Sequence, residues 1–273
     1  MFSPKPAAMV TLRSAALLVS AVLVYACATS PLGRNQLILF PDAEMTQMGV
    51  AAFQDIKTKT PVASSAKVNG YVTCVSENII RALPNGQPSE WEIRVFDEDQ
   101  ANAFALPGRK IGVYTGLLDV AENQGQLATV IGHEVAHVLA NHSNERVSTN
   151  FVTQSGLQLA QIAVGANTPM KQQLFGLLGV GAQYGVLLPF GRAQEAEADL
   201  VGLELMAEAG FDPRESVKLW QNMQAAAGGG GPPEFMSTHP SSQTRITELN
   251  ARMGEYMQIS TRARAAGRVP DCR

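Results

Sequence analysis

The feature that most constrains this chain is the segment His133-Glu134-Val-Ala-His137, which lies in a stretch with apolar residues at helical spacing. Residues four apart on an α-helix lie on one face, so His133 and His137 can offer two imidazole nitrogens to one metal ion. The carboxylate of Glu134 can then reach a water molecule on that ion and act as a general base. Two ordinary helix histidines beside a solvated glutamate are the alternative. Against it, three of the four histidines of the chain fall within residues 133–142.

A catalytic zinc ion takes three protein ligands and keeps one position open. A second helix, expected within residues 191–210, carries Glu195, Glu197 and Asp199. Glu195 and Asp199 share a face, whereas Glu197 is turned away by about 200°. We therefore expect Glu195 as the third ligand and Asp199 as the acceptor that orients a ligand histidine. Glu197 is expected at the surface, solvated or in a salt bridge. His142, about 140° round the helix from the second ligand histidine, is expected to be structural.

Other metals fit this residue set less well. Two imidazoles and one carboxylate also match the facial triad of non-haem iron oxygenases. A glutamate adjacent to a ligand has no purpose there, and a structural zinc site more often uses cysteines. We therefore expect one zinc ion per chain. The net charge of −3 gives no reason to expect a nucleic acid as a partner.

The pattern of apolar residues predicts an α+β fold that is mainly α. Residues 42–57 and 66–82 have helical spacing, whereas residues 91–95, 102–106 and 111–114 read as strands. We expect these strands to form a small antiparallel sheet just before the metal-binding helix. An exposed edge of the sheet can hydrogen-bond an extended peptide and hold it over the metal. A purely structural hairpin is the alternative.

The first 27 residues are expected to lie outside the folded domain. Lys5 and Arg13 precede an apolar run of about a dozen residues, which suits a secretory signal better than a membrane-spanning helix. The sequence Val-Tyr-Ala-Cys27 resembles a bacterial lipobox, so Cys27 is the expected lipidation site and lipid anchor. A plain signal peptide cut just before Cys27 is the alternative. With the neutral Ala28 next in the chain, we expect a lipoprotein of the outer membrane that faces the periplasm.

Two further cysteines, Cys74 and Cys272, lie outside this leader. In an oxidising compartment they can pair and tie the C-terminal end of the chain to an early helix. Two free thiols are an equal alternative.

Four segments together resemble the HtpX/BepA/LoiP-type zinc metalloprotease family, which is related to the prenyl-protein CAAX proteases. These segments are His133-Glu-x-x-His137, Glu195-x-Glu-Ala-Asp199, Asn102-Ala103-Phe104-Ala, and Thr238-His239-Pro240 with Arg245. The resemblance implies a gluzincin metalloprotease domain, which we place at residues 28–256, followed by a basic tail at 257–273 that is frayed from residue 262. It implies zinc-dependent endopeptidase activity, which in envelope members acts on misfolded or misassembled outer-membrane proteins. It also implies that Asn102, Ala103 and Phe104 bind the substrate.

His239 is expected in the catalytic site in one of two roles. As a hydrogen-bond donor it would stabilise the oxyanion of the transition state. The resemblance also permits His239 to occupy the open metal position and keep the enzyme latent. A histidine that only caps the helix after Pro240 is a third interpretation. Arg245 is expected to pair with a carboxylate near the site or to be solvated.

A lipid-anchored chaperone or assembly factor with a latent or structural zinc site is the rival function. An intact Glu134 favours the enzyme, because a binding protein needs no general base at this position.

The apolar, glycine-rich residues 174–190 are expected to cover the metal-binding helix as a hairpin or to form a lid that touches the membrane.

Overall fold

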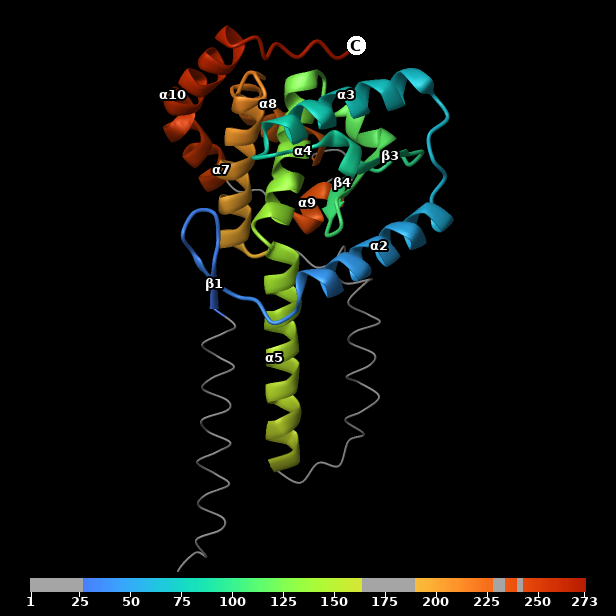
Figure 1. Ribbon diagram of the computed structural model, residues 1–273, viewed down its shortest axis with the longest axis vertical. Helices are drawn as coiled ribbons and strands as arrows, with labels where there is room; N and C mark the ends of the chain where they lie inside the picture. The colour runs from blue at the N-terminus through green and yellow to red at the C-terminus, as the bar shows by residue number, and fades with distance from the viewer. Residues whose placement is uncertain (1–26, 164–189, 228–233, 240–242) are drawn as a thin grey trace, which may run out of the picture.

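The computed structural model describes residues 27–163, 190–227, 234–239 and 243–273 (Figure 1). Of the predicted signal segment 1–27 and the predicted hairpin 174–190, all but the last residue of each lie outside these ranges; Cys27, which was expected outside the fold, begins strand β1. Helix α4 runs through the middle of the domain, with α7 and α10 on one side and α3 and a small sheet on the other (Figure 1). Helix α5 continues below α4 and projects from the body of the domain. This arrangement is the mainly helical α+β fold that the sequence predicts.

The helices and strands follow one another along the chain, with two short 3-10 turns, η1 and η2. Their bounds are β1 Cys27–Thr29, β2 Asn35–Leu37, α2 Asp42–Lys59, α3 Ala66–Ala82, η1 Pro88–Glu90, β3 Glu92–Phe96, β4 Ala103–Leu106, β5 Lys110–Tyr114, η2 Thr115–Asp119, α4 Gln124–Leu139, α5 His142–Ala163, α7 Arg192–Glu208, α8 Glu215–Ala227, α9 Glu234–Thr238 and α10 Gln243–Ala265.

The sheet before α4 contains the three predicted strands, but it is mixed rather than purely antiparallel. Its strand order is β3-β5-β4, with β5 antiparallel to β4 and parallel to β3. The connection between β3 and β4 carries the chain past the position that β5 later fills. This crossover makes β3 and β5 run in the same direction. It also leaves β4 at the edge of the sheet nearest α4.

The C-terminal segment is ordered, so the prediction of a frayed tail is wrong. Helix α10 continues to Ala265, and Cys272 forms a disulfide bond with Cys74 of α3. Of the two alternatives for these cysteines, the structure contains the pair. The bond closes a ring with a sequence separation of 198 residues, which restricts the unfolded chain more than the folded one. The tail is therefore part of the fold.

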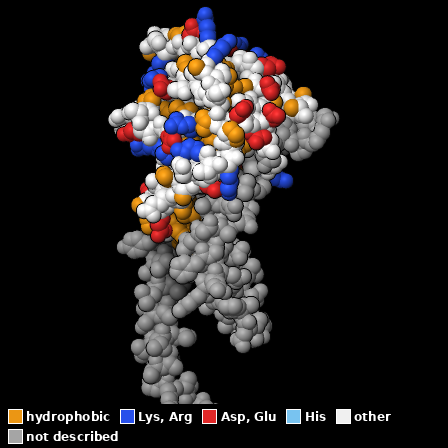
Figure 2. Space-filling view, turned by 90° about the vertical axis from the view of Figure 1, so that its right-hand side faces the viewer, with side chains coloured by type: hydrophobic (Ala, Val, Ile, Leu, Met, Phe, Trp, Pro, Cys, Tyr) orange, Lys and Arg blue, Asp and Glu red, His pale blue; other side chains and the backbone are white. Residues whose placement is uncertain are grey.

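The surface and the helices give two further observations. On the face that Figure 2 shows, Lys and Arg side chains are interspersed with Asp and Glu. Among the helices that the structure describes, none combines the length and the apolar character that a membrane-spanning segment requires.

Candidate metal centre

Helix α4 carries His133, Glu134 and His137 in a segment that is buried along almost its whole length. Asn123 caps this helix, because its side-chain oxygen accepts hydrogen bonds from the backbone N–H groups of the second and third helical residues, at 2.9 and 3.0 Å. The cap satisfies donors that have no partner within the helix. The spacing of four residues then places the two histidine rings on one side, with their centroids 4.7 Å apart.

Helix α7 brings its carboxylates to the same place because it crosses α4 at two glycines. A Cβ atom on Gly202 would lie 2.7 Å from the backbone nitrogen of His133, and one on Gly132 would lie 2.9 Å from the carbonyl oxygen of Gly202. Two positions without side chains therefore let the helix backbones come into contact. Glu195 and Asp199, which are one turn apart on α7, both reach His133 across this crossing.

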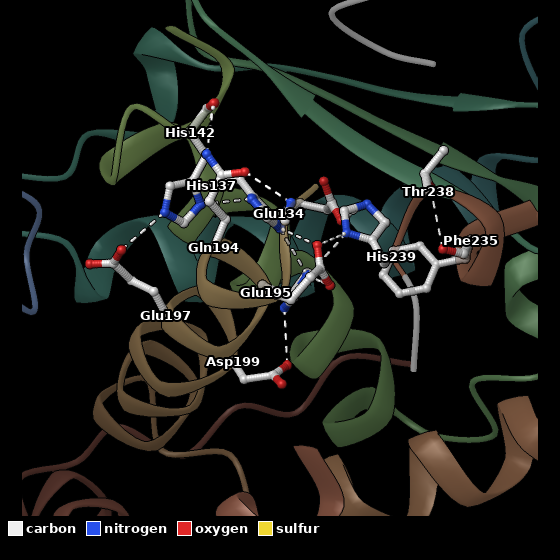
Figure 3. A network of polar contacts seen from close by, with 12 residues as sticks. Glu134, His137, His142, Gln194, Glu195, Glu197, Asp199, Phe235, Thr238 and His239 are labelled. Carbon is white, nitrogen blue, oxygen red and sulfur yellow. Dashed lines mark hydrogen bonds and ion pairs between the residues drawn. The ribbon is translucent and has the colours of Figure 1, made fainter. Parts of the chain in front are cut away.

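Four side chains converge on one point, and each offers one potential metal ligand. They are His133, His137, Glu195 and His239, and their ligand atoms all lie within 4.8 Å of one another. The two Nε2 atoms of His133 and His137 are 3.0 Å apart, and Nδ1 of His239 lies 3.0 Å from Glu195 Oε1. Figure 3 shows Glu195 between His137 and His239. Nitrogen and oxygen lone pairs packed this closely in a buried site suit a cation, and imidazole with carboxylate is a donor set of zinc.

Burial and charge set the protonation of these groups. Burial opposes a positive charge on His133, but the carboxylates of Asp199 and Glu195 outweigh it and raise the pKa of His133 to about 9. Burial lowers the pKa of His137 well below its usual value. Burial would raise the pKa of Glu195, but the surrounding histidines hold that pKa far below its ordinary range. A cation bound here would displace the proton of His133 and would meet an ionised carboxylate.

Glu134 lies beside this cluster and is not one of its four members. Its Oε2 accepts a hydrogen bond from the backbone N–H of Ala105 at 3.2 Å, and its Oε1 lies 3.3 Å from Nε2 of His239. Burial raises the pKa of Glu134. The carboxylate is thus next to the metal ligands and next to the edge strand β4, where a general base for an attacking water would be needed.

Arg245 and Asp199 support the cluster from α10 and α7. The guanidinium of Arg245 donates two hydrogen bonds to Asp199, at 2.6 and 2.7 Å, and its Nη1 lies 2.7 Å from Glu195 Oε2. Asp199 Oδ1 in turn lies 3.2 Å from Nδ1 of His133. Of the two alternatives for Arg245, the structure contains the pairing with carboxylates.

Glu197 is in a salt bridge, which was one of its two predicted states, but the prediction that it lies at the surface is wrong. Its side chain is 3% exposed, and its Oε2 contacts Nε of Arg34 at 3.0 Å and Nε2 of His142 at 3.2 Å. His142 is fully buried, and its Nδ1 lies 2.8 Å from Nδ1 of His137. Burial lowers the pKa of His142, so this imidazole is neutral near pH 7. His142 therefore contacts a candidate ligand and is not itself a member of the cluster.

Aromatic rings close the cluster, which the motifs did not indicate. Phe190 stacks on His137 with centroids 3.8 Å apart, and Phe235 stacks on His239 at 4.5 Å. The guanidinium of Arg146 lies 3.9 Å from the centre of the Phe190 ring. The sequence gives a weak indication for Phe235 only. It lies four residues before His239, which is the spacing of neighbouring side chains on a helix.

The predicted substrate strand, with Asn102, Ala103 and Phe104, lies next to the site, but not all of it faces the site. The N–H of Tyr114 donates to the carbonyl of Asn102, so even-numbered residues of β4 bond to β5. The N–H and C=O groups of Ala103 and Ala105 therefore point away from β5, to the edge that faces α4, where both residues are buried and the N–H of Ala105 donates to Glu134. The Phe104 side chain packs among Phe53, Phe96 and Tyr114, with centroids 6.1–6.2 Å away, so the predicted contact of this residue with substrate stays a prediction for its backbone.

A cavity of about 450 Å³ adjoins the cluster. The residues that line it include His137, Asn141, Thr46 of α2 and Pro107 at the β4–β5 turn. The cavity thus connects a candidate ligand to the end of β4, which is where a chain bound along the strand edge would continue.

The comparisons with known proteins agree with this site. The model of a family described as Peptidase family M48 matches residues 66–253, which include α4, α7 and His239. The chain is 38% identical over 186 residues to the mitochondrial metalloendopeptidase OMA1 of Schizosaccharomyces pombe, covering 68% of this chain and 53% of that protein. It is 37% identical over 178 residues to the mitochondrial metalloendopeptidase OMA1 of Saccharomyces cerevisiae, covering 62% and 49%.

A bacterial relative is more distant. The beta-barrel assembly-enhancing protease of Yersinia pestis is 26% identical over 221 residues, which cover 78% of this chain and 44% of that protein. The chain thus spans about half the length of the curated relatives that it matches.

Proposed function

The chain belongs to peptidase family M48, and from this we propose that it is a zinc-dependent endopeptidase of the bacterial cell envelope that degrades misfolded or misassembled outer-membrane proteins. The observation that carries the proposal is the geometry around α4. Two histidines of one helix meet a glutamate of a second helix, and Glu134 lies beside them without joining the set of ligands.

The family-level prediction is confirmed, whereas the relatives do not single out the HtpX/BepA/LoiP type. The envelope location rests on other features. The lipobox-like sequence ending at Cys27 favours export and a lipid anchor at the outer membrane, facing the periplasm. The bond between Cys74 and Cys272 favours an oxidising compartment. The name of the Yersinia pestis relative favours substrates related to β-barrel assembly.

In this proposal, His133, His137 and Glu195 hold one zinc ion. When bound there, zinc supplies a Lewis acid that activates water and polarises the scissile carbonyl. Glu134 takes the proton of the attacking water and passes it to the leaving amine. Once Glu134 releases the N–H of Ala105 and this edge of β4 becomes accessible, the backbone of Ala103 and Ala105 holds the substrate in an extended form and presents the scissile bond to Glu134.

His239 acts as a latch in the closed conformation described here. Its Nδ1 lies 3.2 Å from Nε2 of His133 and 3.0 Å from Glu195, which supports a role as the fourth ligand. Its Nε2 is 3.3 Å from Glu134, so the same ring also covers the base. A closed zinc site with four protein ligands has no room for water and substrate. His239 must therefore move before peptide cleavage.

Replacement of His239 by alanine is expected to raise the rate of casein cleavage. If the open form is about 10% populated, loss of the latch raises activity about tenfold. The measurement is kcat/KM on casein for the zinc-loaded variant, with Ser237→Ala, an exposed change on the short helix α9 that ends just before His239, as the control. A fall in activity at unchanged zinc content would instead indicate that His239 donates a hydrogen bond to the oxyanion.

The closed fourth position also favours the second candidate function, a lipid-anchored chaperone with a permanently latent zinc site. The two functions differ in what zinc removal does. For an endopeptidase, the purified protein is expected to contain about one zinc per chain and to cleave casein. A chelator is expected to abolish cleavage, and added zinc to restore it. Zinc-loaded protein that binds unfolded β-barrel protein but cleaves neither it nor casein, with His239→Ala equally inert, would favour the chaperone.

A further inference from the structure

A chain of buried contacts leads away from His137, on the side opposite its candidate metal-binding atom. Nδ1 of His137 lies 2.8 Å from Nδ1 of His142, and Nε2 of His142 lies 3.2 Å from Oε2 of Glu197. Figure 3 shows these three side chains in sequence, with Glu197 at the outer end. The endopeptidase mechanism above uses neither His142 nor Glu197.

The positions of the protons in this chain follow from one condition. If Nε2 of His137 is to bind a cation, its lone pair must be free, so the proton of this neutral ring lies on Nδ1. The Nδ1–H of His137 then donates to Nδ1 of His142, which must carry the lone pair. The proton of His142 lies on its Nε2 and donates to Glu197. Each ring nitrogen is thus either a donor or an acceptor. Because the carboxylate of Glu197 can only accept, it favours hydrogen bonds that run from His137 through His142 to Glu197 over the reverse order.

The geometry of α7 explains why a second imidazole is needed. Asp199 shares a face with Glu195 and reaches Nδ1 of His133 directly, at 3.2 Å. Glu197 is rotated by about 200° from Glu195 and cannot approach the ring of His137 in the same way. His142, at the start of α5, spans the distance between them. Each of the two ligand histidines thus has a buried carboxylate behind it, one in direct contact and one through another ring.

Glu197 is held in place from outside α7. Its Oε1 accepts a hydrogen bond from the backbone N–H of Leu32 at 3.2 Å, and its Oε2 accepts one from Arg34 at 3.0 Å. Arg34 also pairs with both carboxylate oxygens of Glu145 on α5. Leu32 and Arg34 belong to the β1–β2 hairpin, so this N-terminal element fixes the outer end of the contact chain.

We propose that His142 and Glu197 are positioning residues that fix the tautomer and the orientation of His137 for metal binding. The proposal rests on the metal site of the proposed function. Partners of this kind typically contribute about 10- to 100-fold to metal affinity. His142 passes the effect of the carboxylate to the ligand, and the hairpin at residues 27–37 supports the carboxylate.

The test compares three replacements of His142 by their zinc dissociation constants, measured in competition with a chromogenic chelator. His142→Phe fills the space but cannot accept a hydrogen bond, so zinc binding is expected to weaken about 10- to 100-fold. His142→Ala is expected to behave alike. His142→Gln is expected to stay within about threefold of the original protein, because its amide O–C–N group has the same acceptor–carbon–donor order as the imidazole Nδ1–Cε1–Nε2.

A control variant separates positioning from a general loss of packing. Ser148 lies on the same helix, is fully buried and accepts a hydrogen bond from the N–H of Leu39. Ser148→Ala therefore removes a buried contact near His142 without touching the contact chain, and its zinc affinity is expected to be unchanged. In addition, ¹⁵N spectra of the metal-free protein are expected to show the His137 proton on Nδ1 and to show a mixture of tautomers in His142→Phe.

The outcomes distinguish this proposal from the function on which it rests. If the unmodified chain binds zinc at about one equivalent and His142→Phe binds it equally tightly, the positioning role is refuted while the endopeptidase proposal stands. An equal loss of affinity in His142→Phe and His142→Gln would also refute it, because the amide restores both hydrogen bonds. If the unmodified chain binds no zinc, both proposals fail.

Discussion

Replacement of Glu134 by glutamine is expected to lower the rate of peptide cleavage about 100- to 10,000-fold while the protein keeps its zinc. Glutamine has the same shape as glutamate, and its amide oxygen can still accept the hydrogen bond that Ala105 donates at 3.2 Å. It cannot take a proton from water near neutral pH. Because Glu134 lies outside the set of four converging ligand atoms, its loss is not expected to release the metal.

The measurements are kcat/KM on casein and the zinc content of the same preparation. Glu122→Gln is a matched control, since Glu122 is an exposed glutamate just before α4, and it is expected to change neither value. Loss of zinc from the Glu134 variant would mean that this carboxylate is a ligand. Undiminished cleavage at full zinc content would require a different general base.

Replacement of Arg245 by leucine is expected to reduce the free energy of unfolding of the metal-free protein by about 3–5 kcal/mol. The guanidinium is 6% exposed and pairs with the carboxylates of Asp199 and Glu195, which are 7% and 1% exposed. Without it, two buried carboxylates lose the cation between them. The ring of Trp220, which lies 4.1 Å from the guanidinium carbon, loses its stacking partner as well.

The measurement is denaturant-induced unfolding in the presence of a chelator, so that zinc does not mask the change. Arg81→Leu removes a second arginine–carboxylate pair, in which Arg81 and Glu77 are 55% and 34% exposed. Exposed pairs contribute at most about 1 kcal/mol. If the free energy of unfolding falls by a similar amount in both variants, burial of the Arg245 pairs does not make them contribute more to stability than an exposed pair.

The sequence predicts the centre of the site because the information there is local. The spacing of His133 and His137 fixes their common face as soon as α4 is a helix, and the same rule separates Glu195 from Glu197 on α7. Helical periodicity gives the direction of each side chain around its own helix, but it does not show which other elements pack against that helix. The interpretation of Glu197 as a surface residue failed for that reason, since its partner Arg34 is 163 residues away.

Features that depend on packing between distant elements were not predicted. The alternation of residues in β3, β4 and β5 indicates strands, but the parallel pairing of β3 with β5 depends on the path of the connection. The alternation of β4 could not show that Phe104 turns away from the site, because both faces of this strand are buried. Phe190 is the last residue of the apolar segment 174–190, which was expected to cover the metal-binding helix, but nothing in the sequence indicates that its ring stacks on His137.

The bond between Cys74 and Cys272 has a topological consequence for any cut in the chain. All four converging ligands lie between these cysteines, so the site is built entirely from one covalent ring. A single break in a connecting segment of the ring opens it without separating its parts. The two new ends stay on one molecule, at a high effective concentration relative to each other, and the imidazoles of α4 keep the carboxylates of α7 as neighbours. Only a reductant that opens this bond would let such fragments diffuse apart.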